Sequence, residues 1–249
     1  MLDDFHLEKL EFDYFKIIKF HLLQDLNHIL KGLNSRIATL NDWYDQFIKT
    51  ARSGYQASDL ETGAERIFHH FFAPIFKFPN SSPIGSDLMY QIPDAIIHID
   101  VKTALITNPS DYKGKINVSS NQSSYRVDNK FSSNLPFYYH INGNEIPCLT
   151  YVIQIVHEHA KPNIKALILA AIPNGQLFGF YNKSIFRSGK SGVNKSKDFI
   201  FKYSDEPRFK IISEDSGRNI FRVELIYLSN DLQVEEITAN KNIPVNQKF

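Results

Sequence analysis

Two aspartates and a lysine lie close together in residues 85–103, a segment with the pattern of two strands. If Pro93-Asp94 forms a two-residue turn, the strands pair so that Asp87 lies opposite Asp100 on the same face of a sheet. Lys102 shares this face, because strand side chains repeat every two residues. The spacing therefore predicts a cluster of two carboxylates and one ammonium group.

Such a cluster has the residue types of a metal-dependent hydrolase. Opposed carboxylates lie about 5 Å apart at their Cβ atoms and repel each other, and a divalent cation relieves this repulsion. Mg²⁺ accepts carboxylate oxygens together with waters and a substrate phosphate. We therefore expect Asp87, Asp100 and the carbonyl group of Val101 to bind Mg²⁺. Lys102 is expected to stabilise the attacking water or the charged phosphoryl transition state.

The same residues resemble a known nuclease motif. Asp87, twelve intervening residues and then Asp100-Val101-Lys102 are similar to the PD-(D/E)XK motif, in its usual context of a helix followed by a hairpin. Within this superfamily, residues 60–200 most resemble the EcoRV-like type II restriction endonucleases. The resemblance implies an α/β fold with a mixed central β-sheet flanked by helices. It also implies a homodimer that cleaves double-stranded DNA at a short palindrome with Mg²⁺, leaving 5′-phosphate and 3′-hydroxyl ends.

The chain departs from the family motif at its first aspartate. The family has a proline before this residue, whereas here Ser86 precedes Asp87 and the Pro-Asp pair is Pro93-Asp94. We favour Asp87 as the metal ligand, because Asp94 in a tight turn points away from Lys102.

The family also places an acidic side chain on the helix before the hairpin. Glu61, Glu65 and His69 are each spaced by one helical turn, so at most two of them can point at the metal. We expect Glu65 to take the catalytic role, because Glu61 lies at the end of the helix, where fraying occurs. Alignment of Ile67-Phe68 with the family helix would instead select His69.

The pattern of apolar residues predicts helices first and strands after them. Helical spacing covers residues 5–30, 36–50 and 60–76, with Pro74 kinking or ending the third helix. Strand patterns cover residues 88–92, 95–104, 150–156, 166–171, 177–181 and 220–228. We expect residues 1–55 to form an N-terminal helical element for packing or dimerisation. Residues 56–249 are expected to form the nuclease domain with its DNA-recognition loops.

The 249 residues carry a net charge of +1, but the basic residues are concentrated in the middle of the chain. Residues 104–203 hold 12 basic and 5 acidic side chains, a pattern that can follow a phosphate backbone or form solvated loops. Residues 187–197 also lie where the similar restriction enzymes carry a base-reading loop. The candidate DNA-binding residues of this region are Lys113, Lys115, Asn117, Ser119, Asn121, Arg187, Lys190, Asn194 and Lys197.

The remaining composition excludes several classes of protein. With 43% apolar and 22% charged residues, the chain is neither collagen-like nor of low complexity. Its single cysteine, Cys148, cannot form an internal disulfide or hold an iron–sulfur cluster. The apolar stretches are too short to span a bilayer and the first residues lack a basic signal segment. We therefore expect a cytoplasmic protein without a membrane partner.

Two other functions fit part of this pattern. A PD-(D/E)XK nuclease of repair or recombination would share the chemistry but recognise DNA structure in place of sequence. A catalytically silent DNA-binding protein would explain the basic middle of the chain. It would leave the opposed carboxylates beside Lys102 without a purpose.

Overall fold

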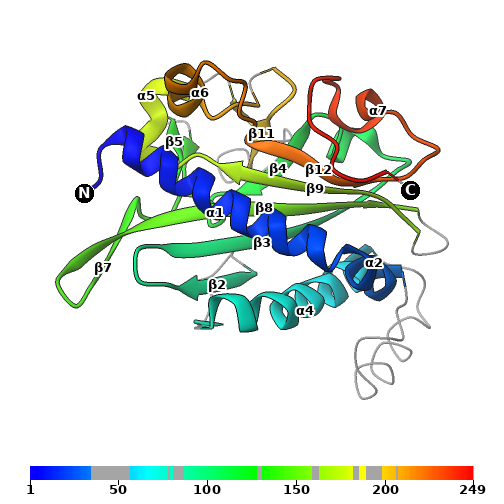
Figure 1. The fold of residues 1–249 in the computed structure, drawn as a ribbon, viewed down its shortest axis with the longest axis horizontal. Helices are drawn as coiled ribbons and strands as arrows, with labels where there is room; N and C mark the ends of the chain where they lie inside the picture. The colour runs from blue at the N-terminus through cyan, green and yellow to red at the C-terminus, as the bar shows by residue number, and fades with distance from the viewer. Residues whose placement is uncertain are drawn as a thin grey trace.

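Helices precede most of the strands along the chain, as the sequence predicts (Figure 1). The computed structural model describes residues 1–34, 57–77, 79–80, 87–127, 131–158, 163–181, 185–188, 198–205 and 207–248. The helix expected over residues 36–50 lies outside the described residues.

The first helical segment is divided in two. Helix α1 spans Asp4–Gln24 and helix α2 spans Leu26–Asn34, whereas the sequence predicts one helix over residues 5–30. Asp25 leaves the helical conformation at φ −110° and ψ 18°. The break lets α2 change direction and bury Leu26, Ile29 and Leu33. Tertiary packing stabilises this arrangement, and the helical periodicity of the sequence alone does not reveal it.

Helix α4 spans Ala57–Phe76 and carries an aromatic ridge. Phe68, Phe72 and Phe76 follow one another at a spacing of four residues, so they lie on one face, and their rings stack at centroid distances of 6.0 and 5.8 Å. All three side chains are buried. Pro74 lies inside the last turn of the helix and does not end it.

The main sheet is mixed, as expected. Its described strands run in the order β1-β2-β3-β8-β9-β12, and β7 pairs with β8. Among these strands β3 and β8 are parallel, whereas the other neighbours are antiparallel. The bounds are Pro79–Asn80 (β1), Leu88–Gln91 (β2), Ile96–Leu105 (β3), Tyr138–Ile141 (β7), Asn144–His157 (β8), Ile164–Ile172 (β9) and Val223–Leu228 (β12).

Two smaller sheets and several short helices complete the described structure. One small sheet has the order β10-β11-β4, and the other pairs β5 with β6. These strands span Lys115–Ser119 (β4), Arg126–Val127 (β5), Phe131–Ser132 (β6), Phe186–Ser188 (β10) and Asp198–Lys202 (β11). The short helices span Pro109–Asp111 (η1), Gly175–Leu177 (η3), Phe178–Tyr181 (α5), Lys210–Ser216 (α6) and Val234–Thr238 (α7).

The strand expected over residues 177–181 is wrong, because this segment forms η3 and α5. Asn174 caps the first turn through its side chain, which accepts a hydrogen bond from the backbone of Gln176. Leu177 and Tyr181 are buried, and Phe180 is exposed. The buried positions therefore repeat every four residues, which is a helical spacing that the short apolar run conceals.

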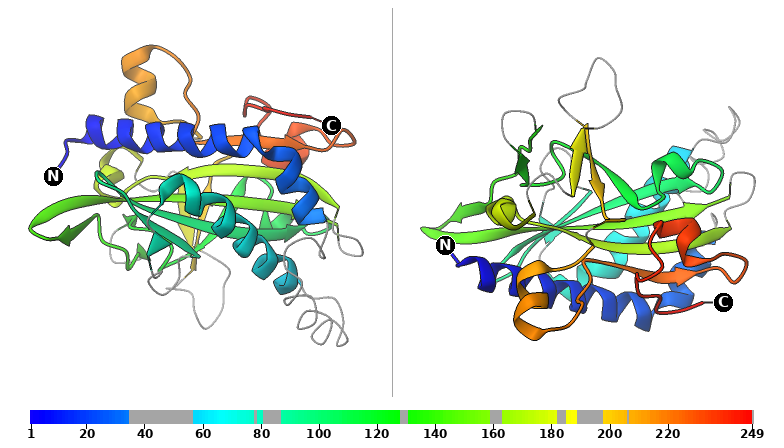
Figure 2. Two further views of the ribbon diagram at one scale, coloured as in Figure 1. Left: turned by 60° about the horizontal axis from the view of Figure 1, so that its bottom comes forward. Right: turned by 90° about the horizontal axis from the view of Figure 1, so that it is seen from above.

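The long helices α1 and α4 and the β10-β11-β4 sheet lie on opposite sides of the main sheet. Helix α1 packs against β8, β9 and β12, while α4 packs against β2 and β3. Figure 2 shows α1 and α6 on one side of the main sheet and the hairpin of β10 and β11 projecting from the other. Leu7, Phe15 and Ile18 of α1 share one continuous core with the sheet.

No helix in the described part of the chain is long and apolar enough to cross a membrane.

Replacement of Phe72 by alanine should lower the free energy of unfolding by about 3–5 kcal/mol, because it leaves a cavity between α4 and the sheet. Phe20 is the matched control, since it is 60% exposed on α1. Its replacement by alanine should change the stability by no more than about 0.5 kcal/mol. Equilibrium unfolding in urea measures both effects. Two equally small effects would show that α4 does not belong to the cooperative core.

Candidate active site and DNA-binding face

The β2–β3 hairpin has the predicted register. Strands β2 and β3 pair with Leu88 opposite Ile99, and the backbone N–H of Ile92 donates to the carbonyl of Ala95 at 3.0 Å. Pro93-Asp94 is therefore the connecting turn. Continuing the same register by one residue places Asp87 opposite Asp100, as predicted.

The two faces of the hairpin have different neighbours. Tyr90, paired with Ile97, contacts the ring of Phe76 on α4 at a centroid distance of 5.3 Å. Because side chains alternate along a strand, Asp100 and Lys102 project from the opposite face of β3. The catalytic candidates therefore lie on the face of the sheet that α4 does not cover.

The three charged groups of the hairpin are in close contact. Lys102 Nζ lies 2.9 Å from Asp100 Oδ2, and the backbone N–H of Val101 donates to Asp87 Oδ2 at 2.6 Å. The side chain of Asp100 is 2% exposed, whereas that of Lys102 is 21% exposed. The predicted cluster is thus brought together, with the lysine head partly open to solvent.

Burial dominates the electrostatics of Asp100. Loss of solvation raises the pKa of its carboxyl group well above the usual range, Lys102 opposes this rise and Asp87 adds to it. Apart from the Lys102 ammonium group beside Oδ2, no hydrogen bond of standard geometry reaches the carboxylate oxygens of Asp100 within the described residues. A divalent cation fits such a group, because it would neutralise the two carboxylates and use the lone pairs that Lys102 does not occupy.

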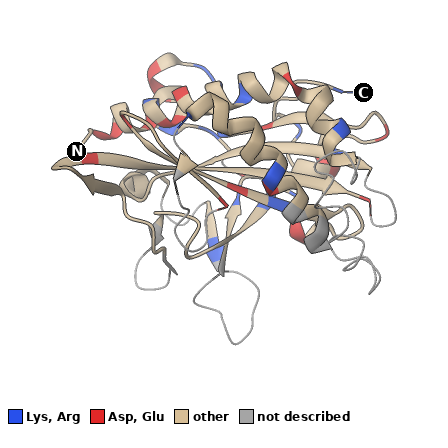
Figure 3. Cartoon of the chain, turned by 90° about the horizontal axis from the view of Figure 1, so that it is seen from below, with Lys and Arg blue, Asp and Glu red and all other residues tan. Residues whose placement is uncertain are grey.

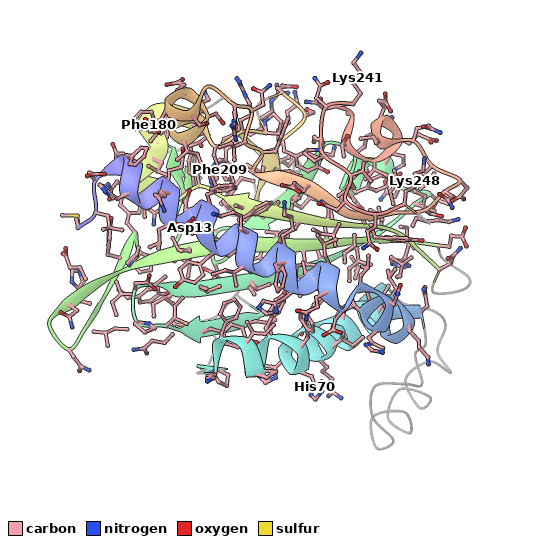
Figure 4. The ribbon with its side chains drawn as sticks, viewed as in Figure 1. Asp13, His70, Phe180, Phe209, Lys241 and Lys248 are labelled. Carbon is pink, nitrogen blue, oxygen red and sulfur yellow. The ribbon has the colours of Figure 1, made fainter. Side chains whose placement is uncertain are left out.

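Among the described side chains of α4, none is placed as a third metal ligand beside Asp87 and Asp100. Within the described residues, no group of three His, Cys, Asp or Glu side chains is placed to hold a metal ion. Glu65 is half-buried and His69 is exposed on α4, which packs on the other face of β3. The neighbouring His70 points away from the sheet (Figure 4). The side chain of Glu61 lies outside the described part, and the role of Glu65 stays a prediction.

Sequence reasoning missed Gln154 on β8. The parallel ladder places Gln154 beside Lys102, and the side-chain amide of Gln154 donates to the carbonyl of Asp111 at 3.2 Å. Its carbonyl oxygen is buried without a hydrogen-bond partner among the described residues. The pairing of β3 with a strand some fifty residues later leaves no signal in the local pattern, so Gln154 could not be found from the sequence.

The β10-β11-β4 sheet has one apolar and one polar face. Ile116, Val118, Phe186, Phe199 and Phe201 are buried on its inner face. Lys115, Asn117 and Ser119 alternate with the buried residues of β4, so they project from the outer face. Basic residues mark the strands of this sheet in the view from below (Figure 3).

A row of three different side chains crosses the outer face. Arg187 pairs with Ile200, and Ile200 pairs with Asn117. Arg187 is 61% exposed and lies 3.8 Å from Asp205. The sequence predicts Arg187 and Asn117 as DNA-binding residues, but it gives no indication of Ile200, because the strand pairing decides which residue stands between them.

The other DNA-binding candidates are distributed unevenly. Lys113 is exposed beside β4, and Asn121 is half-buried and accepts a hydrogen bond from the side chain of Asn134. Lys190, Asn194 and Lys197, which belong to the predicted base-reading loop, lie outside the described residues.

The chain matches a known family of restriction enzymes. Residues 5–161 match the N-terminal domain of the type II restriction enzyme MwoI. The chain belongs to this family of restriction enzymes. It is a site-specific endodeoxyribonuclease, the enzyme class that the motif predicts. The general expectation of a restriction endonuclease is confirmed, and a particular likeness to EcoRV-like members stays a prediction.

Two solved structures share the fold of the restriction enzyme. The restriction endonuclease BglI, bound to its DNA recognition sequence, has a TM-score of 0.63 and 15% identity, over 88% of this chain and 90% of BglI. The tetrameric restriction endonuclease SfiI, bound to cognate DNA, has a TM-score of 0.55 and 13% identity, over 81% of this chain and 80% of SfiI. No curated protein sequence matches the chain. The expected mixed α/β fold is confirmed.

Two substitutions separate the charge of Asp87 from its hydrogen bond with the Val101 N–H in the metal-free restriction enzyme. Asp87→Asn and Asp87→Ala both remove the charge beside Asp100, but only asparagine keeps an oxygen that can accept from Val101 N–H. The alanine variant should therefore be less stable than the asparagine variant by about 1–3 kcal/mol. Urea unfolding in EDTA measures the difference. Equal stabilities would show that the hydrogen bond to Val101 contributes nothing.

Proposed function

We propose that the protein cleaves double-stranded DNA at a specific site by Mg²⁺-dependent in-line attack of water, leaving 5′-phosphate and 3′-hydroxyl ends. The observation that carries this proposal is the hairpin cluster, in which Asp87 and Asp100 are opposed and Lys102 Nζ lies 2.9 Å from Asp100. A structural protein has little reason to keep two carboxylates at this spacing on a buried strand.

Each residue of the cluster has a distinct part in this reaction. Asp87 and Asp100 would hold the cation, with the carbonyl of Val101 as a further candidate ligand, and the bound cation would supply Lewis-acid stabilisation of the phosphate. The Val101 N–H donates a hydrogen bond to Asp87 Oδ2 at 2.6 Å and so restricts the orientation of this carboxylate. Lys102 stands beside Asp100 with its ammonium group partly exposed, where it can stabilise negative charge on the attacking water or the phosphoryl group.

The β10-β11-β4 sheet is proposed to bind DNA through its outer face. Lys115 supplies a positive charge for phosphate, while Asn117 and Arg187 can form paired hydrogen bonds with adenine and guanine. Ile200 between them can contact a thymine methyl group. The face projects from the side of the main sheet opposite α1 (Figure 2), which is also the side of Asp100 and Lys102.

A homodimer acting on a short palindrome is the proposed assembly. Two active sites are needed to cut both strands, and two-fold protein symmetry matches two-fold symmetry of the DNA site. Support comes from the fold shared with BglI and with SfiI, which was solved as a tetramer on cognate DNA.

Digestion of plasmid DNA with Mg²⁺ tests the proposed reaction. Wild-type protein should give discrete bands, whereas a repair nuclease would nick selected structures and a silent DNA-binding protein would leave the plasmid intact. Asp87→Ala and Asp100→Ala should each reduce the cleavage rate by at least about 10³-fold, while binding to a duplex carrying the mapped site remains measurable in Ca²⁺.

Asp94→Asn is the matched control for the metal ligands. Asp94 lies in the turn and accepts a hydrogen bond from the Tyr14 hydroxyl, which asparagine can preserve. Its cleavage rate should stay near that of the wild type. Loss of cleavage in Asp94→Asn together with normal cleavage in Asp87→Ala would show that Asp94 is the first aspartate of the motif.

Replacement of Asn117 by alanine should weaken binding to the cleavage site by about 1–3 kcal/mol and leave binding to random DNA almost unchanged, because a base contact is lost. Lys115→Ala should weaken binding to both duplexes alike and reduce the salt dependence, as expected for a phosphate contact. Lys16→Ala on α1 is the control and should affect neither. Fluorescence anisotropy in Ca²⁺ measures the affinities, and equal losses on both duplexes in Asn117→Ala would contradict base reading.

A further inference from the structure

A buried charged cluster lies outside the active site, between α1 and the C-terminal third of the chain. Arg222 is fully buried, and its Nη2 lies 2.7 Å from Glu11 Oε2 and 3.2 Å from Glu8 Oε1. Its Nε donates to the Tyr181 hydroxyl at 2.7 Å. The guanidinium carbon stands 4.6 Å from the centre of the Tyr181 ring and 4.1 Å from that of Phe209.

The cluster is costly to keep. Two carboxylates face one guanidinium without solvent, and burial raises the pKa of Glu11 to about 7 even though Arg222 opposes this rise. Replacement of such a buried ionic group by apolar side chains is often neutral or stabilising in proteins. A cluster of this kind is therefore better explained by what it holds in place than by a contribution to stability.

The cluster holds together two ends of one chain segment. Tyr181 is the last residue of α5, and the chain then forms β10 and β11 before it returns at Phe209. At the return, the backbone N–H of Lys210 donates to the Tyr181 hydroxyl at 2.9 Å and to Glu8 Oε1 at 3.1 Å. The two ends of the segment therefore meet at a single phenol.

Helix α1 supports this junction from its own side of the main sheet. The Tyr181 hydroxyl donates to Glu8, whose other oxygen accepts from Ile212 N–H at 2.8 Å. The Phe209 ring packs edge-on against Phe12 and Phe15 of α1, at centroid distances of 5.3 and 5.8 Å. Figure 4 shows Phe209 between α1 and α6. The first helix thus anchors the base of a hairpin that projects from the far side of the sheet.

We propose that Tyr181, held by Glu8 and Arg222, is a positioning residue for DNA recognition. It closes the base of the β10–β11 hairpin on α1 and so fixes the direction in which Arg187 and Ile200 face DNA. This inference rests on the proposed function, because contact between the hairpin and DNA is itself a proposal. A hairpin whose two ends are tied has little freedom to tilt, so its side chains meet base edges in one register.

Tyr181→Phe tests the junction, and Tyr151→Phe is its matched control. Tyr151 is also fully buried and also donates to α1, to the Glu11 carbonyl at 2.8 Å, but it lies on β8 and belongs to neither end of the hairpin segment. Each variant loses one buried hydroxyl that donates to α1. The Tyr181 hydroxyl also accepts from Arg222 and Lys210, so its loss should destabilise the protein more. A general loss of stability lowers binding to every duplex alike, so the ratio of two affinities does not depend on it.

The first measurement compares affinities in Ca²⁺ for a duplex carrying the mapped cleavage site and for a random duplex. Tyr181→Phe should reduce the ratio of the two affinities by about tenfold or more, since base contacts are lost when the hairpin tilts. The rate of single-turnover cleavage at saturating enzyme in Mg²⁺ should stay within about threefold of the wild type. The reason is that Asp87 and Asp100, on the separate β2–β3 hairpin, are unchanged. Tyr151→Phe should preserve both values. An unchanged ratio in Tyr181→Phe, or an equal fall in both variants, would overturn the proposal.

The second measurement needs no DNA. Backbone amides of residues 185–188 and 198–203 should exchange hydrogen at least about tenfold faster in Tyr181→Phe than in Tyr151→Phe, because the base of the hairpin opens more often. Equal exchange rates would overturn the junction. If the wild-type protein fails to cut plasmid DNA, the proposed function falls, and the exchange rates still decide whether the junction holds the hairpin. Should Tyr181→Phe fail to fold, Glu8→Gln serves in its place, since it keeps the side-chain shape and one acceptor oxygen.

Discussion

The side chain of Asp100 lies on a central strand and is 2% exposed, and the electrostatics of the candidate active site depend on this burial. Loss of solvation raises the pKa of the group, so its charged form needs positive partners close by. Lys102 provides one partner at 2.9 Å from the same strand face. A divalent cation between Asp100 and Asp87 would provide the other partner in the proposed reaction.

The arrangement of the layers keeps the packing helices away from the proposed catalytic residues. Helices α1 and α4 pack on the opposite face of the main sheet, and the β10-β11-β4 sheet projects from the side of Asp100 and Lys102. The parts that are proposed to bind DNA are therefore supported through the main sheet. Glu8 and Tyr181 provide a direct connection, because their hydrogen bonds join α1 to both ends of the segment that contains β10 and β11.

The sequence by itself determined the features that depend on local geometry. A two-residue turn at Pro93-Asp94 and the alternation of strand side chains are enough to place Asp87 opposite Asp100 and Lys102 on the same face, and the structure has this register. The helical spacing of apolar residues over 60–76 and the apolar runs of residues 150–156 and 166–171 likewise indicate α4, β8 and β9. These predictions succeed because each depends on residues that are neighbours in the chain, where turn and strand geometry leave few alternatives.

Only the tertiary structure decided which distant elements meet. The parallel pairing of β3 with β8 brings Gln154 beside Lys102, and the pairing of β4, β10 and β11 places Ile200 between Arg187 and Asn117. Arg222 meets Glu8 across more than two hundred residues. The break at Asp25 and the helical turn of residues 178–181 also follow from packing, which overrides local preference where a buried side chain gains more from its partner than from its own segment. Contacts between distant segments leave no periodic signal in one sequence, so burial and pairing in three dimensions had to reveal them.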